Sequence, residues 1–182
     1  AELRIAADGF ISQHTDGEGT ENVGSDLEVA TKIRLLEQVG WRPATSLLAG
    51  LRCPTGGDAV TSDGYDPMAK LIASWEIGER FSVDANLGFG GPTQSPDDSD
   101  RVFETFAAAS MGVALGERVG SFFEYFATLR GSGRDDEHAV DAGLTYLATD
   151  DVQLDVSAGA GLNRAAPDVF VGVGVAWRFH EP

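Results

Sequence analysis

Apolar and charged residues alternate strictly along residues 25–37, "SDLEVATKIRLLE". The two sets of alternate positions are Leu27, Val29, Ile33 and Leu35 against Glu28, Lys32 and Arg34. A helix, which turns about 100° per residue, would scatter both sets around its axis, whereas a strand places them on opposite faces. The stretch therefore predicts a β-strand with one apolar and one charged face.

The same two-residue period recurs along the whole chain, in ten segments bounded by clusters of Gly, Pro, Asp or Ser that are typical of turns. The segments are 2–10, 26–38, 45–53, 68–77, 81–90, 102–115, 121–130, 138–147, 152–163 and 168–179. No stretch has the period of a long helix, and 182 residues suffice for one domain. We predict an all-β fold, a single domain over 1–182 that forms an antiparallel up-and-down barrel of about ten strands.

The connections between these segments alternate in length. Those after the first, third, fifth and seventh segments are long and polar, whereas those after the second, fourth, sixth and eighth are short. The ninth, "RAAP", is brief and departs mildly from this rule. Because a meander brings all odd links to one end, we predict a long-link end and a short-turn end. Transmembrane barrels show the same asymmetry.

The ten segments share a nearly charge-free apolar face and an opposite face that carries charges and glycines. The charged positions are Arg4, Glu28, Lys32, Arg34, Arg52, Lys70, Glu76, Asp84, Glu124, Asp141, Asp155 and Arg178. A soluble barrel would bury the apolar face, and alternation alone does not reject it. Glycine weakens a strand on a solvated surface but leaves room inside a narrow barrel. We therefore interpret the charged residues as pore-lining and the apolar residues as lipid-facing.

Aromatic residues gather at the short-turn end of the apolar face. They are Trp41, Trp75, Phe81, Tyr146, Trp177 and Phe179, with Phe89 and Phe103 as weaker candidates at the other end. Trp and Tyr favour a membrane interface because their rings are apolar while their N–H or O–H stays hydrated. Segments of about 9 to 12 residues also suit tilted strands that cross a bilayer. Both features favour a membrane barrel.

The net charge of −16 argues against nucleic acid as a partner, since phosphates favour Lys and Arg. Much of the charge lies in the four long polar links, each of which carries three acidic residues. These acids could bridge divalent ions to lipopolysaccharide or steer cations, but solvated links explain them more simply. The single cysteine, Cys53, excludes an internal disulfide and a multi-cysteine metal site.

Catalytic residues are not evident. His14, His138 and His180 have no Ser or Asp partner placed on a strand by the sequence, and no nucleophile elbow or metal-ligand spacing occurs. Mixed charges on a pore wall explain the acidic and basic residues of the charged face better than an acid/base pair does. We expect no enzyme activity, no catalytic residues, no cofactor and no metal.

Several stretches are similar to a known family. "DLEVATKIRLL", "LLAGLRCPTGGD", "FSVDANLGFG" and the closing block "DAGLTYLATDDVQLDVSAGAGLNRAAPDVFVGVGVAWRF" resemble the outer-membrane channel family associated with the meta-pathway of phenol degradation. The resemblance implies a narrow monomeric barrel of about twelve strands that lets bulky, often hydrophobic small molecules diffuse across the membrane. Two further strands normally precede the one resembling "ELRIAADGF", so the chain is expected to lack an N-terminal hairpin or to close with ten strands.

These observations lead to one main hypothesis and two alternatives. The main hypothesis is a bacterial outer-membrane barrel, in contact with lipid and lipopolysaccharide, whose narrow polar lumen passes small, hydrophobic or aromatic solutes by diffusion. One alternative is a soluble or periplasmic barrel that binds an apolar ligand. The other is a structural or adhesive barrel with a plugged lumen.

Overall fold

The computed structural model describes residues 1–7, 10–15, 19–24, 26–57, 61, 64–91, 93–95, 98–101, 103–131 and 133–178. Ala7 and the strands β2, β3, β8 and β9 are described by their backbone alone. The described residues contain strands, turns and bends. They include no helix long and apolar enough to cross a membrane.

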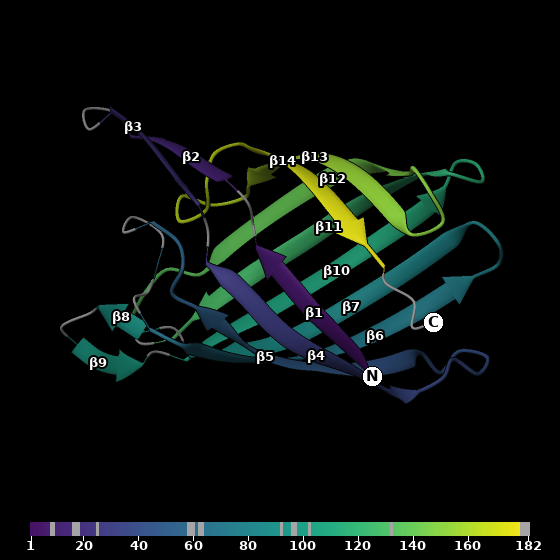
Figure 1. Ribbon diagram of the computed structural model, residues 1–182, viewed down its shortest axis with the longest axis horizontal. Helices are drawn as coiled ribbons and strands as arrows, with labels where there is room; N and C mark the ends of the chain where they lie inside the picture. The colour runs from purple at the N-terminus through teal and green to yellow at the C-terminus, as the bar shows by residue number, and fades with distance from the viewer. Residues whose placement is uncertain are drawn as a thin grey trace.

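Ten antiparallel strands form one sheet, and each pairs with the strands nearest to it in the meander (Figure 1). In sheet order they are β1 (Glu2–Ala7), β4 (Leu27–Leu36), β5 (Ala44–Cys53), β6 (Asp66–Ile77), β7 (Phe81–Gly90), β10 (Glu104–Ala114), β11 (Val119–Arg130), β12 (Glu137–Leu147), β13 (Val152–Gly161) and β14 (Phe170–Trp177). All ten segments predicted from alternation are therefore confirmed as strands of an up-and-down sheet. The alternation succeeds because a strand places successive side chains on opposite faces.

Two small hairpins were not predicted. β2 (Phe10–Thr15) pairs with β3 (Gly19–Gly24), and β8 (Thr93–Ser95) pairs with β9 (Asp98–Arg101). The prediction of a first strand over 2–10 was wrong at its end, because β1 stops at Ala7 and Phe10 opens β2. Both hairpins lie within long links, whose polar composition gave no apolar alternation to detect. They extend the long-link end, at the left of Figure 1.

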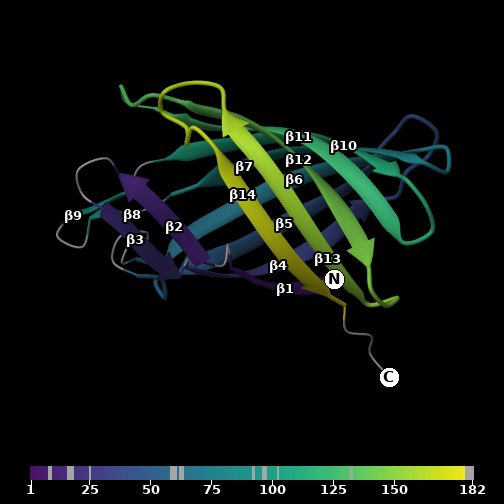
Figure 2. The same cartoon turned by 90° about the horizontal axis from the view of Figure 1, so that it is seen from above.

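The sheet curls into a half-barrel, so its faces are concave and convex (Figure 2). β1 and β14 are its two edges, and each pairs on one side only among the described strands. Figures 1 and 2 both show these edges facing each other across the opening. The described residues thus give ten strands curled toward closure, without hydrogen bonds between the first and the last.

The two ends of the half-barrel are fixed by different local interactions. At the long-link end, Asp26 Oδ1 accepts hydrogen bonds from the backbone N–H of Thr55 at 3.0 Å and of Gly56 at 2.8 Å. Thr55 Oγ1 in turn accepts from the backbone N–H of Leu27 at 2.9 Å. The Pro-Thr-Gly strand end is therefore tied to the start of β4. At the short-turn end, Gly78 has a φ of 66°, a conformation that other residues rarely adopt.

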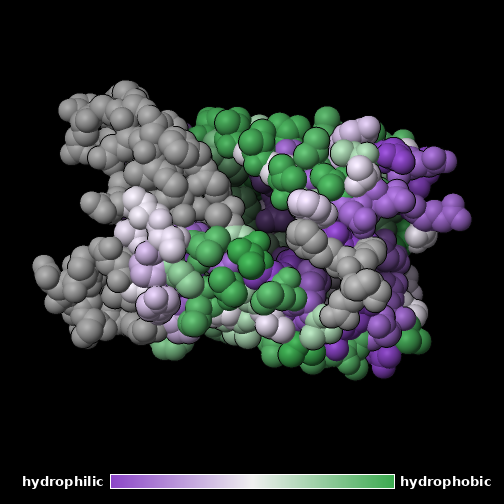
Figure 3. All heavy atoms as spheres, in the orientation of Figure 1, coloured by the Kyte–Doolittle hydropathy of each residue, from purple (hydrophilic) through white to green (hydrophobic). Residues whose placement is uncertain are grey.

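The apolar side chains lie on the convex face and are exposed (Figure 3). Phe123 and Leu144 are both 51% exposed although they lie on central strands, β11 and β12. Among the described residues, the buried apolar side chains are four alanines and one leucine, Leu48. An apolar core of the kind that stabilises a soluble domain is thus missing from the part of the chain that the structure describes.

Candidate functional site

The residues predicted to line a pore share the concave face. Strand register connects them, since Glu28 is opposite Arg52 and Glu124 is opposite Asp141. All four residues occupy the alternate strand positions whose side chains point to the charged face. Arg34 also occupies one of these positions, and the β-bulge between Arg34 and Leu36 begins directly after it. Arg178 lies just beyond β14, where its backbone N–H donates to the carbonyl of Asp151 at 2.8 Å. The structure therefore assembles on one surface residues that are far apart in sequence.

A row of polar side chains crosses the middle of this face. Register places four residues of neighbouring strands in line, and we call them the acidic row: Asp84, Ser110, Glu124 and Asp141. Asp84 accepts a hydrogen bond from Ser74 on β6. Asp141 Oδ1 is buried and has no hydrogen-bond partner among the described residues. A buried acceptor of this kind needs a partner, so the row favours contact with water or a polar solute.

Lys70 provides a positive charge beside the acidic row. Its Cγ atom lies 3.5 Å from the position that a Cβ on Gly88 would take, so the lysine stem runs over that glycine from β6 toward β7. The charges of Lys70, Asp84 and Asp141 all act on the carboxyl group of Glu124. The centre of the concave face is therefore a mixed-charge zone with an excess of acids.

Phenylalanine rings occupy much of the space that the glycines leave. A Cβ on Gly90 would lie 2.8 Å from the ring of Phe106, and one on Gly143 would lie 2.5 Å from the ring of Phe122. A Cβ on Gly159 would likewise collide with the ring of Phe170. Each ring lies over a glycine of a neighbouring strand, an arrangement known as aromatic rescue. The glycines lie on the concave face as expected, but at these positions rings fill the space that was expected to stay open.

A network of ion pairs lies at the long-link end of the concave face. Its members are Glu104, Arg130, Arg134 and Glu137, and we call it the mouth network. Arg130 contacts Glu104 at 3.1 Å and Glu137 at 2.5 Å, while Arg134 contacts Glu104 at 3.3 Å. The Glu104 side chain is only 11% exposed, so the two arginines satisfy a nearly buried carboxylate.

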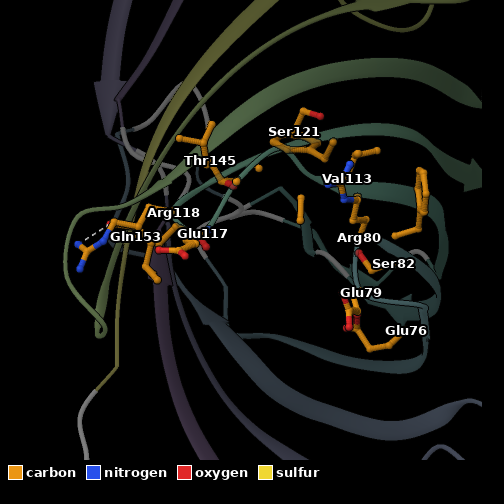
Figure 4. Close-up of a pocket in the computed structure, with 18 of the residues that line it drawn as sticks. Glu76, Glu79, Arg80, Ser82, Val113, Glu117, Arg118, Ser121, Thr145 and Gln153 are labelled. Atoms are coloured by element: carbon orange, nitrogen blue, oxygen red, sulfur yellow. Dashed lines mark hydrogen bonds between the residues drawn. The ribbon is translucent and has the colours of Figure 1, made fainter.

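Within the described residues a cavity opens at each end of the concave face. The larger, of about 560 Å³, lies at the short-turn end and reaches Asp84 and Ser110. Figure 4 shows Glu76 and Ser82 on one side of it and Thr145 on the other. The smaller, of about 260 Å³, lies at the long-link end between β11, β12 and the link before β14. Phe122 lines the first cavity and Phe126 the second, so Glu124 lies between the two along β11.

The predicted interface aromatics lie at the short-turn end. Trp41 is exposed in the link before β5, and its carbonyl accepts a hydrogen bond from Trp75 Nε1 at 2.9 Å. Phe81, Tyr146 and Trp177 are exposed on the convex face, whereas Phe179 lies outside the described residues. Tyr125 lies near the middle of β11 on the convex face, where its hydroxyl contacts His138 Nδ1 at 2.7 Å.

Comparison with protein families gives one match. The model of the family described as "Putative MetA-pathway of phenol degradation" covers residues 2–179. The chain belongs to this family. The resemblance seen in the sequence is thereby confirmed. No curated protein matches the chain.

In this member of the phenol-degradation family, sequence reasoning missed two parts of the site. The mouth network escaped because Glu104 and Arg130 are distant in sequence and become neighbours only through β10–β11 pairing. The inward rings of Phe122 and Phe126 escaped because aromatic residues were sought on the apolar face. The sequence did indicate their orientation, since Phe122 and Phe126 are each two residues from Glu124 on β11 and so lie on the same face of the strand.

No group of three or more His, Cys, Asp or Glu side chains within the described ranges is placed to hold a metal ion. Cys53 is a free, partly exposed thiol at the end of β5. Of the three histidines, His138 contacts Tyr125 on the convex face, whereas the side chain of His14 and all of His180 fall outside the description.

Proposed function

We propose that this chain forms an outer-membrane barrel through which small, hydrophobic or aromatic molecules diffuse passively. In this arrangement lipid and lipopolysaccharide surround the convex face, a small solute enters the lumen, and the barrel is a monomer. The proposal includes neither enzyme activity nor a cofactor. The family description, which names phenol degradation, agrees with a small aromatic solute.

The observation that carries this proposal is the distribution of side chains between the two faces. Exposed apolar residues cover the convex face even on the central strands, while the concave face carries the charges. In water, such an exposed apolar surface would be far larger than monomeric proteins tolerate. In a bilayer the same surface contacts lipid tails, and neighbouring strands satisfy each other's backbone polar groups within the sheet, from β1 to β14.

The cavities support a path along the concave face. One opens at each end; Asp84 and Ser110 of the acidic row line the larger cavity, and Glu124 follows along β11 toward the smaller one. Charges that line a narrow passage select solutes by size and polarity without chemical change. The proposed route therefore runs from the apolar cavity at the long-link end, past Glu124, to the polar cavity at the short-turn end.

Solute flux into proteoliposomes tests this function. A small neutral sugar such as arabinose is used, because hydrophobic compounds cross lipid unaided. We expect the wild-type protein to accelerate liposome swelling above empty vesicles. Ser110→Trp, which places a large ring in the acidic row, is expected to slow swelling severalfold, because the ring would occupy part of the larger cavity on the proposed route.

The matched control is Ala109→Trp, which adds the same ring one residue away on the exposed convex face. It is expected to leave the swelling rate unchanged. Swelling no faster than in empty vesicles would contradict the proposal. Equal losses in both variants would also contradict it, because the flux would then not depend on the concave face.

A further inference from the structure

The cavity at the long-link end differs in character from the rest of the concave face. It lies between Phe126, Ala139, Ala166, Pro167 and Phe170, and we call it the ring pocket. Ala139 and Ala166 are buried, at 3% and 7% exposure. Its lining is therefore mainly apolar, although it opens on the charged face of the sheet.

We propose that the ring pocket is a binding site for one neutral, single-ring aromatic molecule that carries a hydroxyl group. This inference rests on the proposed channel function. It adds to that function the class of solute and the site in the lumen at which the solute binds. The volume of about 260 Å³ is adequate, since an apolar cavity of roughly 150 Å³ holds a benzene molecule. The dimensions thus suit one ring with a small substituent.

The two phenylalanines are arranged to contact such a ring. Their centroids are 5.9 Å apart with an interplanar angle of 62°, an edge-to-face pair. The ring of Phe170 lies over Gly159, so the backbone of β13 supports it from behind. A third ring can add to this pair by stacking or edge contact without a large rearrangement.

The polar residues that line the ring pocket are Thr128, Glu137 and His138, and the His138 ring also contacts Tyr125. Thr128 and Glu137 face each other across β11 and β12 and both line the pocket. A solute hydroxyl can donate to either of them, which would orient the ring toward Phe126 and Phe170. The nearby arginines, Arg130 and Arg134, are already paired in the mouth network. The chemistry therefore favours a neutral solute over a carboxylate.

The link before β14 closes one side of the ring pocket. The backbone N–H of Gly161 donates to the carbonyl of Pro167 at 2.9 Å, and that of Leu162 donates to the carbonyl of His138 at 2.7 Å. These bonds hold Ala166 and Pro167 against the end of β13. The pocket is therefore preformed, which lowers the cost of ordering on binding.

Fluorine NMR of 4-fluorophenol with the full chain in detergent tests the inference, with empty micelles as background. We expect saturable binding to the wild type and about tenfold weaker binding to Phe126→Ala, because an aromatic partner is lost. Phe123→Ala removes a ring from the convex face of the same strand and is expected to bind as the wild type does. Ala166→Leu, a second variant, fills the pocket from the link and is expected to abolish binding.

Two outcomes would overturn the inference: no saturable binding to the wild type, or equal weakening by Phe123→Ala and Phe126→Ala. Arabinose flux through the same preparations keeps the two proposals distinguishable. Flux without binding contradicts the ring pocket alone. Binding without flux supports the pocket and contradicts the channel.

Discussion

Val156→Arg is expected to lower the free energy of unfolding by about 2–4 kcal/mol in a lipid bilayer, the cost of an arginine on the lipid face of a membrane barrel near the midplane. Val156 lies in the middle of β13 and is 50% exposed on the convex face. Its cross-strand neighbours, Leu144 and Val173, are apolar and exposed as well. The new charge would therefore lie among lipid tails without a partner.

Ser157→Arg is the matched control for this prediction. Ser157 is the next residue of β13, faces the concave side and lies between Gly143 and Gly172, so its arginine would enter the polar lumen. We expect a loss well below that of Val156→Arg. Urea unfolding from lipid vesicles, followed by tryptophan fluorescence, measures both. A destabilisation at Ser157 equal to or larger than that at Val156 would contradict a lipid-facing convex surface.

Gly143→Ala is expected to cost about 1–3 kcal/mol of stability, the range for overpacking a filled site. A Cβ at this position would lie 2.5 Å from Phe122 Cζ and 2.5 Å from the backbone carbonyl oxygen of Val156. The phenyl ring can rotate away, but the carbonyl belongs to the paired strand β13. The strain therefore has a part that the ring can relieve and a part that it cannot.

A double-mutant cycle separates these two parts. Phe122→Ala removes the ring, so Gly143→Ala is expected to cost less in that background than in the wild type. Gly172→Ala is the control, because its Cβ would meet Ser157 Oγ at 3.0 Å, which is the end of a rotatable side chain. An equal cost of Gly143→Ala with and without Phe122, measured by the same unfolding assay, would show that the contact with Phe122 has no role, and a cost at Gly172 that matches Gly143 would contradict overpacking as the cause.

The strands and the two faces of the fold could be predicted because they depend on local alternation. Leu27 and Glu28 reveal opposite faces by their chemistry alone, whatever strand lies beside them. The hairpin of β2 and β3 could not be found in this way, since its sequences, "FISQHT" and "GTENVG", show no alternation of apolar and polar residues. Its pairing becomes visible only in the structure.

The candidate site was predictable in charge but not in contacts. The parity of Glu124 and Asp141 placed both on the inner face, yet only strand register shows that they lie directly opposite each other. Phe126 and Phe170 are far apart in sequence, and their edge-to-face contact depends on the curl of the sheet and on the link before β14. Long-range contacts of this kind leave no period in the sequence.

The most direct test of the account is the environment of two adjacent side chains on β13. In a Cys53→Ser background, a nitroxide label is attached to Val156→Cys or to Ser157→Cys in lipid vesicles. Electron paramagnetic resonance then measures collisions with oxygen, which concentrates in lipid, and with a water-soluble nickel complex. We expect oxygen to dominate at position 156 and the nickel complex to dominate at position 157. The reverse order, or equal access of the nickel complex to both positions, would contradict a lipid-facing convex surface around a polar lumen.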